Sequence, residues 1–212
     1  MPTVFESQPV EYHVERSRFV GLAFRMKSES ELDSLLSQAR NQYPSANHYT
    51  WAYRLGEWSL RATDDGEPQG TAGFPMLHIL ERENWEETLV IVVRYFGGIK
   101  LGRGGLIRAY QHSAQSALGN TVPGRLTLVR QLHIHIDYPT FERVHRAIEA
   151  QALSYHYEYG GEVSLKIDVE NALEEQLIAL LNESGHNRWS LIDSKEAQKV
   201  LPIDLPGKND RG

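Results

Sequence analysis

The feature that most constrains this chain is residues 94–110, which read RYFGGIKLGRGGLIRAY. An apolar run at 89–93 precedes this glycine-rich stretch and predicts a buried strand, and a run at 107–118 after it predicts a helix. The stretch carries five glycines and four cations, and it has no acidic residue. These residues are Gly97, Gly98, Gly102, Gly104 and Gly105, with Arg94, Lys100, Arg103 and Arg108.

A strand, a loop of glycines and a helix start with clustered cations predict an anion site, most naturally for phosphate. Glycine lets backbone N–H groups approach a ligand, and free N–H groups at a helix start carry partial positive charge. The spacing matches neither a P-loop nor G-x-G-x-x-G. An alternative interpretation is that the glycines permit tight packing of strand against helix, with the cations solvated or paired with acids.

A second unusual segment, the acidic stretch at residues 63–77, reads TDDGEPQGTAGFPML. It carries Asp64, Asp65 and Glu67 around Gly66. We favour the interpretation that these acids face the cations of the glycine-rich stretch across a shared groove, because close opposite charges keep each other ionised. Two alternatives stay open: a Mg²⁺ site, since hard cations prefer carboxylates, and a simple Asp-Gly turn. Our prediction is that no metal is bound.

Residues 1–122 are expected to form one α+β domain, with the glycine-rich stretch near its end. The periodicity predicts a strand, a helix, a hairpin, a helix, a strand and a helix in that order. The expected ranges are 18–24, 32–39, 48–62, 76–80, 89–93 and 107–118. Pro123 and Gly124 mark the boundary, because patterning resumes after them.

Residues 123–203 are expected to form a second domain of βαββαβ order, a ferredoxin-like plan. Clean alternation at 163–169 and the Gly160-Gly161 turn before it predict a hairpin. Helices are predicted at 139–151 and 171–185, between strands at 128–137 and 189–203. Residues 204–212 are expected to be a loose tail.

Charge and composition limit the possible classes of function. The net charge of −6 means that any nucleic-acid contact must come from a local basic patch. The chain has no cysteine, which excludes disulfides and a thiol nucleophile. Residues 1–19 lack the apolar core of a signal peptide, and no apolar run approaches the ~18 residues of a membrane span. We therefore expect a cytoplasmic protein without membrane contact.

The two stretches together resemble the signature of the IMPACT/YigZ family. Ser17-Arg18-Phe19, His48 and Ala52-Tyr53 fit the same pattern. The motif positions are Asp64, Asp65, Gly66, Glu67, Pro68, Gly70, Thr71, Gly73 and Pro75, then Arg94, Tyr95, Gly97, Gly98, Gly102, Gly104, Gly105 and Tyr110. The resemblance implies a first domain like the second domain of a small-subunit ribosomal protein. It also implies a second domain similar to the last domain of elongation factor G.

The resemblance and the basic patch together predict an RNA- or ribosome-associated protein linked to the regulation of translation. The glycines and cations of the glycine-rich stretch would contact phosphates. Eukaryotic members restrain activation of a translation kinase by competing for its activator, but they do so with an additional N-terminal protein-binding domain, so we do not carry that partnership over. A protein partner in the control of translation is kept as a separate expectation. The resemblance supplies no catalytic residue and no cofactor. The alternative is a Mg-dependent enzyme acting on a phosphorylated small molecule or nucleotide.

Overall fold

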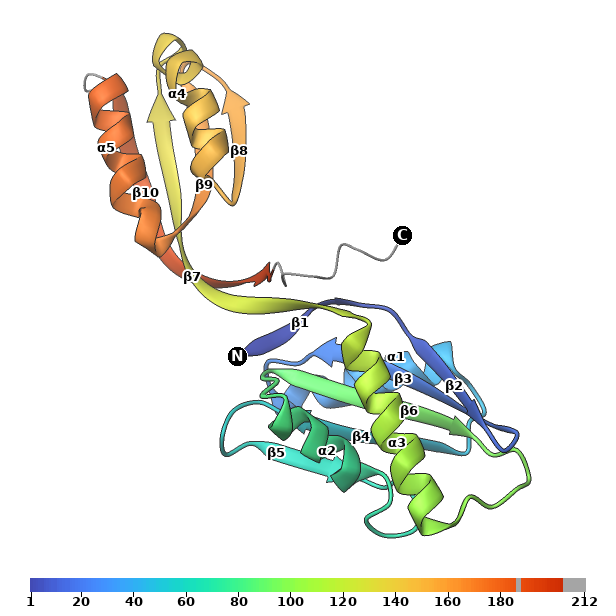
Figure 1. The fold of residues 1–212 in the computed structure, drawn as a ribbon. Helices are drawn as coiled ribbons and strands as arrows, with labels where there is room; N and C mark the ends of the chain where they lie inside the picture. Colours follow the sequence, from blue (N-terminus) through green and yellow to red (C-terminus); the bar gives the residue numbers. More distant parts are fainter. Residues whose placement is uncertain (186–187, 204–212) are drawn as a thin grey trace, which may run out of the picture. The chain divides into compact units, whose positions relative to one another are not determined.

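The computed structural model describes residues 1–185 and 188–203, and it divides the chain into two units. Among the described residues, the first unit comprises 1–125 and 200–203, and the second comprises those between 126 and 199. Strand β7 (Thr121–Ile136) runs through both units, and the expected boundary after residue 122 lies within it. The expected tail at 204–212 lies outside the described residues. Helices and antiparallel sheets occur in both units (Figure 1), which confirms the α+β prediction.

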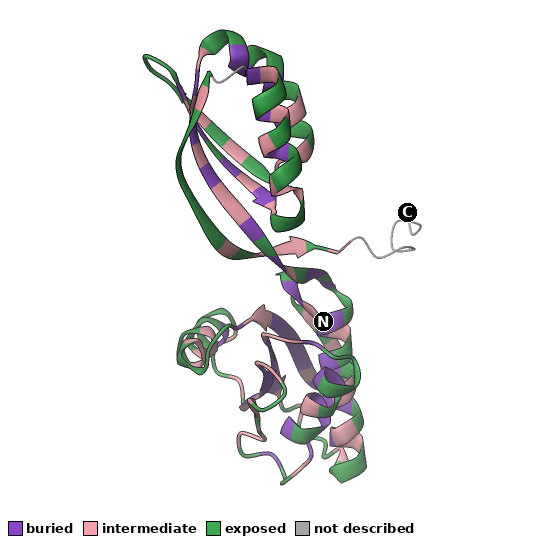
Figure 2. Cartoon of the chain, turned by 90° about the vertical axis from the view of Figure 1, so that its left-hand side faces the viewer, coloured by how far each residue is buried: buried purple, intermediate pink, exposed green. Residues whose placement is uncertain are grey.

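The first unit is built on a five-stranded antiparallel sheet. Its order is β2 (Val10–Val14), β3 (Ser17–Arg25), β6 (Thr88–Tyr95), β4 (His48–Arg54) and β5 (Leu60–Thr63). The central strand β6 is buried along almost its whole length, as its apolar run predicts, and Figure 2 shows the inner strands in purple. Its register places Arg94 opposite Phe19 on β3 and opposite His48 on β4.

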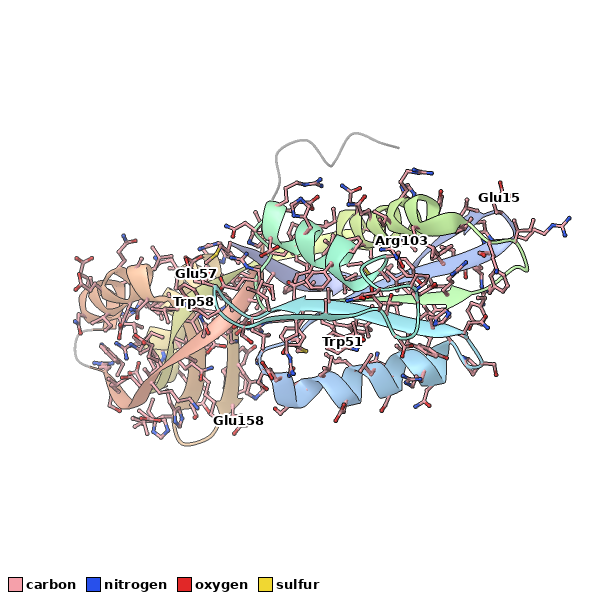
Figure 3. All side chains as sticks on the ribbon, turned by 90° about the horizontal axis from the view of Figure 1, so that it is seen from below. Glu15, Trp51, Glu57, Trp58, Arg103 and Glu158 are labelled. Carbon is pink, nitrogen blue, oxygen red and sulfur yellow. The ribbon has the colours of Figure 1, made fainter. Side chains whose placement is uncertain are left out.

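Helices cover both faces of this sheet (Figure 3). Helices α2 (Gly73–Arg82) and α3 (Gly102–Gly119) pack on one face, where Met76 and Tyr110 belong to a shared apolar core. Helix α1 (Leu32–Gln42) packs on the other face, against a second core. The three inner strands β3, β4 and β6 therefore contribute side chains from their two faces to two different cores.

Two features of the first unit differ from the sequence-based expectation. Strands β1 (Pro2–Ser7) and β2 were not predicted; β1 pairs with the start of β7, so it depends on a partner far along the chain. Helix α3 begins at Gly102 rather than at residue 107, because glycines lower helix propensity and so conceal its first turn. Gly104 and Gly105 therefore lie in a helix and not in a loop.

The second unit follows the predicted βαββαβ order. The elements after β7 are α4 (Tyr138–Gln151), β8 (Ser154–Tyr159), β9 (Val163–Glu170), α5 (Glu174–Gly185) and β10 (Trp189–Pro202). Strand β9 lies between β7 and β8, and β10 also pairs with β7. One apolar core joins both helices to the sheet, with Ile134 and Leu165 on the strands and Phe141 and Leu177 on the helices. Across the described residues, no helix has the length and apolar character needed to cross a membrane.

Candidate anion-binding site in the first unit

The acidic stretch and the glycine-rich stretch meet at a cavity of about 460 Å³ in the first unit. The ends of β4 and β6, the loop before α2 and the start of α3 all contribute to its wall. The lining residues are Asn47, His48, Glu67, Pro68, Arg94, Phe96, Lys100, Leu101, Gly102, Arg103 and Leu106. Tertiary folding thus brings together two segments that the sequence analysis singled out separately.

A buried ion pair forms the inner wall of the cavity. Arg94 Nη1 donates to Glu67 Oε1 over 2.5 Å, and the Tyr110 hydroxyl donates to the same oxygen over 2.7 Å. Burial, then the charge of Glu67 and its hydrogen bond, raise the pKa of Tyr110 far above the ordinary value, so the hydroxyl keeps its proton. Glu67 is therefore held by a cation and a permanent donor.

Arg94 is only 4% exposed and does not act as an open cation. Its guanidinium lies 5.2 Å from the centre of the Phe19 ring and 5.4 Å from that of Phe96. Nη2 makes a long contact of 3.5 Å with Ser17 Oγ, and Nε lacks a hydrogen-bond partner among residues 1–185 and 188–203. The charge of Arg94 is already compensated by Glu67, so the net positive charge of the site must come from other residues.

Two side chains at the start of β4 are oriented by backbone contacts. His48 Nδ1 lies 2.7 Å from the Asp65 carbonyl oxygen, and its Nε2 lies 3.9 Å from Glu67 Oε1. Asn47 Oδ1 accepts from the Phe96 backbone N–H over 2.8 Å. Both side chains line the cavity, and their polar atoms are fixed by main chain rather than by flexible partners.

Asp64 organises the loop that carries Glu67. Its carboxylate accepts from the backbone N–H groups of Gly70, Ala72 and Gly73 at 2.7, 2.9 and 2.8 Å. Burial by itself would raise the pKa of Asp64, but these three hydrogen bonds outweigh it and hold the pKa below its ordinary value. Because Ala72 and Gly73 begin α2, Asp64 supplies the cap that the helix start requires.

Asp65 also binds main chain, because its Oδ2 accepts from the Tyr49 N–H over 2.6 Å. The three acids therefore have different partners: only Glu67 forms an ion pair with a cation of the glycine-rich stretch. Within the described ranges, no three His, Asp or Glu side chains come together as a group that could hold a metal ion. The Mg²⁺ interpretation gains no support from this arrangement.

The cations of the glycine-rich stretch occupy different environments. Lys100 is exposed on the cavity rim, with no hydrogen bond or ion pair to any residue that the structure describes. Arg103 is also exposed, and it donates to the Gln69 carbonyl oxygen over 2.9 Å, beside the acidic stretch (Figure 3). Arg108 is exposed on α3 but does not line the cavity. We call Lys100, Arg103 and the first turn of α3 the basic rim.

The glycines mainly allow the backbone conformation of the loop that leads into α3. A Cβ atom on Gly97 would lie 2.0 Å from the Arg16 carbonyl oxygen, so only glycine fits there. Gly98 and Gly102 have φ values of +85° and +68°, the left-handed region that glycine adopts without strain. Gly102 lines the cavity, whereas Gly97, Gly98, Gly104 and Gly105 do not.

Sequence reasoning missed four residues that line the cavity: Asn47, Phe96, Leu101 and Leu106. Asn47 and Phe96 belong to neither of its candidate groups, and their only signal is that each adjoins a motif residue. His48 entered through the family resemblance alone. Asn47, His48 and Phe96 reach the cavity because β4 and β6 are paired where β4 begins and β6 ends.

Comparison with known proteins shows which family has this sequence pattern. A family model described as the Impact N-terminal domain matches residues 15–118. IMPACT family member YvyE of Bacillus subtilis is 37% identical over 187 residues, covering 85% of this chain and 86% of that protein. IMPACT family member YigZ of Escherichia coli is 33% identical over 129 residues, covering 59% of this chain and 63% of that protein.

A crystal structure of a hypothetical protein is similar to this chain at 25% identity. Its TM-score is 0.59, and the match covers 96% of this chain and 97% of the other. The molecule is thus a two-unit α+β protein in which the family motifs build a cavity with a basic rim. The chain belongs to the IMPACT family, which confirms the resemblance seen in the sequence.

Proposed function

We propose that this protein binds RNA at the cavity of the first unit and takes part in the regulation of translation. The observation that carries the proposal is the basic rim, where two exposed cations adjoin the start of α3. The N-cap of α3 is the apolar residue Leu101, and its first turn has no acidic side chain. Its first backbone N–H groups are therefore available to an anion, and the helix dipole favours negative charge there.

An aromatic ring beside the rim supports RNA over an isolated phosphate ion. Phe96 lines the cavity and is 44% exposed, so its ring is accessible to a base that enters the cavity. Aromatic side chains next to cations are the usual means of binding single-stranded nucleic acid, because every base has a face that stacks. The overall charge of −6 makes such binding local to this patch.

The translational role rests on family membership and on the expected domain types. Under this proposal, the chain acts in the cytoplasm and its partner is RNA, the ribosome or a protein that takes part in the control of translation. The order β10-β7-β9-β8 in the second unit supports a ferredoxin-like domain at 123–203. Under the proposal, this domain assists docking on structured RNA, and the domain at 1–122 has the ribosomal-protein-like fold.

The experiment is a titration of fluorescent single-stranded RNA across a series of salt concentrations. Each phosphate contact on a single strand contributes about 0.7 to the slope of log K against log salt. The double variant Lys100→Ala/Arg103→Ala should therefore reduce the slope by roughly 1.4. The control is Lys27→Ala/Arg61→Ala, which removes two exposed cations of the first unit outside the cavity. Equal slopes for the two double variants would contradict the proposal.

A further inference from the structure

The volume of the cavity limits what part of an RNA can enter it. About 460 Å³ lies in the range of small-molecule sites, enough for one nucleotide but not for several. Proteins that recognise RNA sequence commonly take up single bases splayed out from the strand. The cavity therefore fits one nucleotide, with the rest of the strand outside.

The polar atoms of the inner wall can be assigned from their backbone partners. A carbonyl oxygen only accepts, so His48 Nδ1 carries the proton that it donates to Asp65, and in the neutral ring Nε2 is an acceptor. A backbone N–H only donates, so the Asn47 atom bonded to Phe96 is Oδ1, and Nδ2 is left as a donor. The backbone partners therefore fix both the protonated ring nitrogen of His48 and the orientation of the Asn47 amide.

Glu67 adds further acceptor capacity to this wall. Its Oε1 already receives Arg94 and Tyr110, while Oε2 makes no hydrogen bond within the part of the chain that the structure describes. Arg94 and Tyr110 both donate to this carboxylate, which shows that it acts as a hydrogen-bond acceptor. The wall therefore presents two acceptors, Glu67 and His48 Nε2, and one donor, Asn47 Nδ2.

This inventory distinguishes among the four RNA bases. Guanine carries two adjacent donors, N1–H and N2–H₂, next to the acceptor O6. Adenine and cytosine each offer one amino donor on this edge, and uracil offers one imide donor, so each would leave one of the two acceptors, buried Glu67 or partly exposed His48, without a partner. Leaving a buried polar group unpaired is costly, which is how polar sites reject close analogues.

Resting on the RNA binding proposed above, we infer that the cavity binds a single guanine nucleotide. The N–H edge of the base faces Glu67 and His48, and O6 receives Asn47 Nδ2. The ring lies against Phe96, and the phosphate is held by the basic rim. The ion pair of Glu67 with Arg94 acts as a positioning device, because it fixes the carboxylate in place.

The first test is competition with labelled RNA by GMP, AMP, CMP and UMP. GMP should displace the RNA at concentrations about tenfold lower than the other three, because each of those loses at least one hydrogen bond to Glu67 or His48. IMP, which keeps N1–H but lacks the 2-amino group, should fall between GMP and AMP. Equal competition by all four nucleotides, or by none, would overturn the inference.

The second test uses the isosteric variant Asn47→Asp. An aspartate can still accept from the Phe96 N–H, but it replaces the donor Nδ2 with an acceptor, so it repels O6. We expect GMP affinity to fall about tenfold and the preference over AMP to disappear. An unchanged preference would also refute the assignment. Since Asn47 is exposed, the change leaves the core intact.

The ring contact is tested by Phe96→Ala, with Phe74→Ala as the matched control. Phe74 is 70% exposed on α2 and does not line the cavity. The first variant should weaken GMP binding by about tenfold and the second should leave it unchanged. If RNA binding still depends on Lys100 and Arg103 while GMP fails to compete, the RNA proposal stands and the guanine site falls. If RNA binding does not depend on Lys100 and Arg103 and GMP also fails to compete, both the RNA proposal and the guanine site are wrong.

Discussion

Arg94 Nη1 lies 2.5 Å from Glu67 Oε1, and their side chains are only 5% and 3% exposed. This contact joins the two family stretches in space, although the residues are 27 positions apart in sequence. A buried ion pair contributes little net stability relative to an apolar pair, yet removing one partner leaves an uncompensated buried charge. The acidic stretch and the end of β6 therefore each hold the other in its conformation.

The first prediction concerns this ion pair. Glu67→Gln should lower the free energy of unfolding by about 3–5 kcal/mol, because Arg94 loses its counter-charge. Combining it with Arg94→Met should restore part of the loss, because the apolar replacement needs no partner. Urea denaturation of the two single variants and the double variant measures the coupling. Simple addition of the two single effects would show that the residues act independently.

The second prediction concerns Asp64 and pH. The pKa of Asp64 is lowered in the folded protein, so its contribution to stability is complete above the ordinary aspartate pKa of about 3.9 and disappears as pH falls through the folded value. Asp64→Asn should lower the free energy of unfolding by about 1–2 kcal/mol at pH 7. The difference from wild type should shrink below about pH 4.

The pH measurement compares urea midpoints from pH 7 down to pH 3. Its control is Glu57→Gln, which alters an exposed carboxylate between β4 and β5 (Figure 3). This variant should track wild type at every pH. If the difference in urea midpoint between wild type and Asp64→Asn stays constant from pH 7 to pH 3, the charge of Asp64 does not contribute to the helix cap.

The third prediction separates the roles of the glycines. Gly97→Ala should destabilise the protein by about 2 kcal/mol or more, because the Arg16 main chain occupies the space. Gly98→Ala meets open space but a positive φ, and should cost about 1 kcal/mol. Gly104→Ala lies in a helical turn and should stabilise by roughly 0.5–1 kcal/mol. Thermal unfolding that ranks them otherwise would contradict these local conformations.

The fourth prediction concerns divalent cations. Mg²⁺ alone should leave the melting temperature unchanged, since Asp64 and Asp65 already accept main-chain N–H groups and Glu67 is paired with Arg94. A bound ion at a hundredfold excess over its Kd would stabilise by about 2.7 kcal/mol, which differential scanning fluorimetry detects easily. A saturable shift that EDTA reverses would revive the Mg-dependent alternative.

Local patterning predicted most of the regular elements. The apolar run at 89–93 became the core of β6, and the alternation at 163–169 became β9. It failed where an element depends on distant partners, as in β1, which pairs with residues 121–125. It also failed at Gly102, where the helix start is set by tertiary packing and glycine propensity argues against it.

The sequence by itself determined the family, the element order from β3 onward and the two stretches that build the site. Only the tertiary structure decided how the charges are used: Arg94 is buried against Glu67, Asp64 caps α2, and Lys100 and Arg103 remain at the rim. The physical reason is that charge pairing depends on distance in space. Sheet pairing and the docking of α3 bring Glu67, Arg94 and Tyr110 together across 27 and 43 positions, and no local periodicity records such separations.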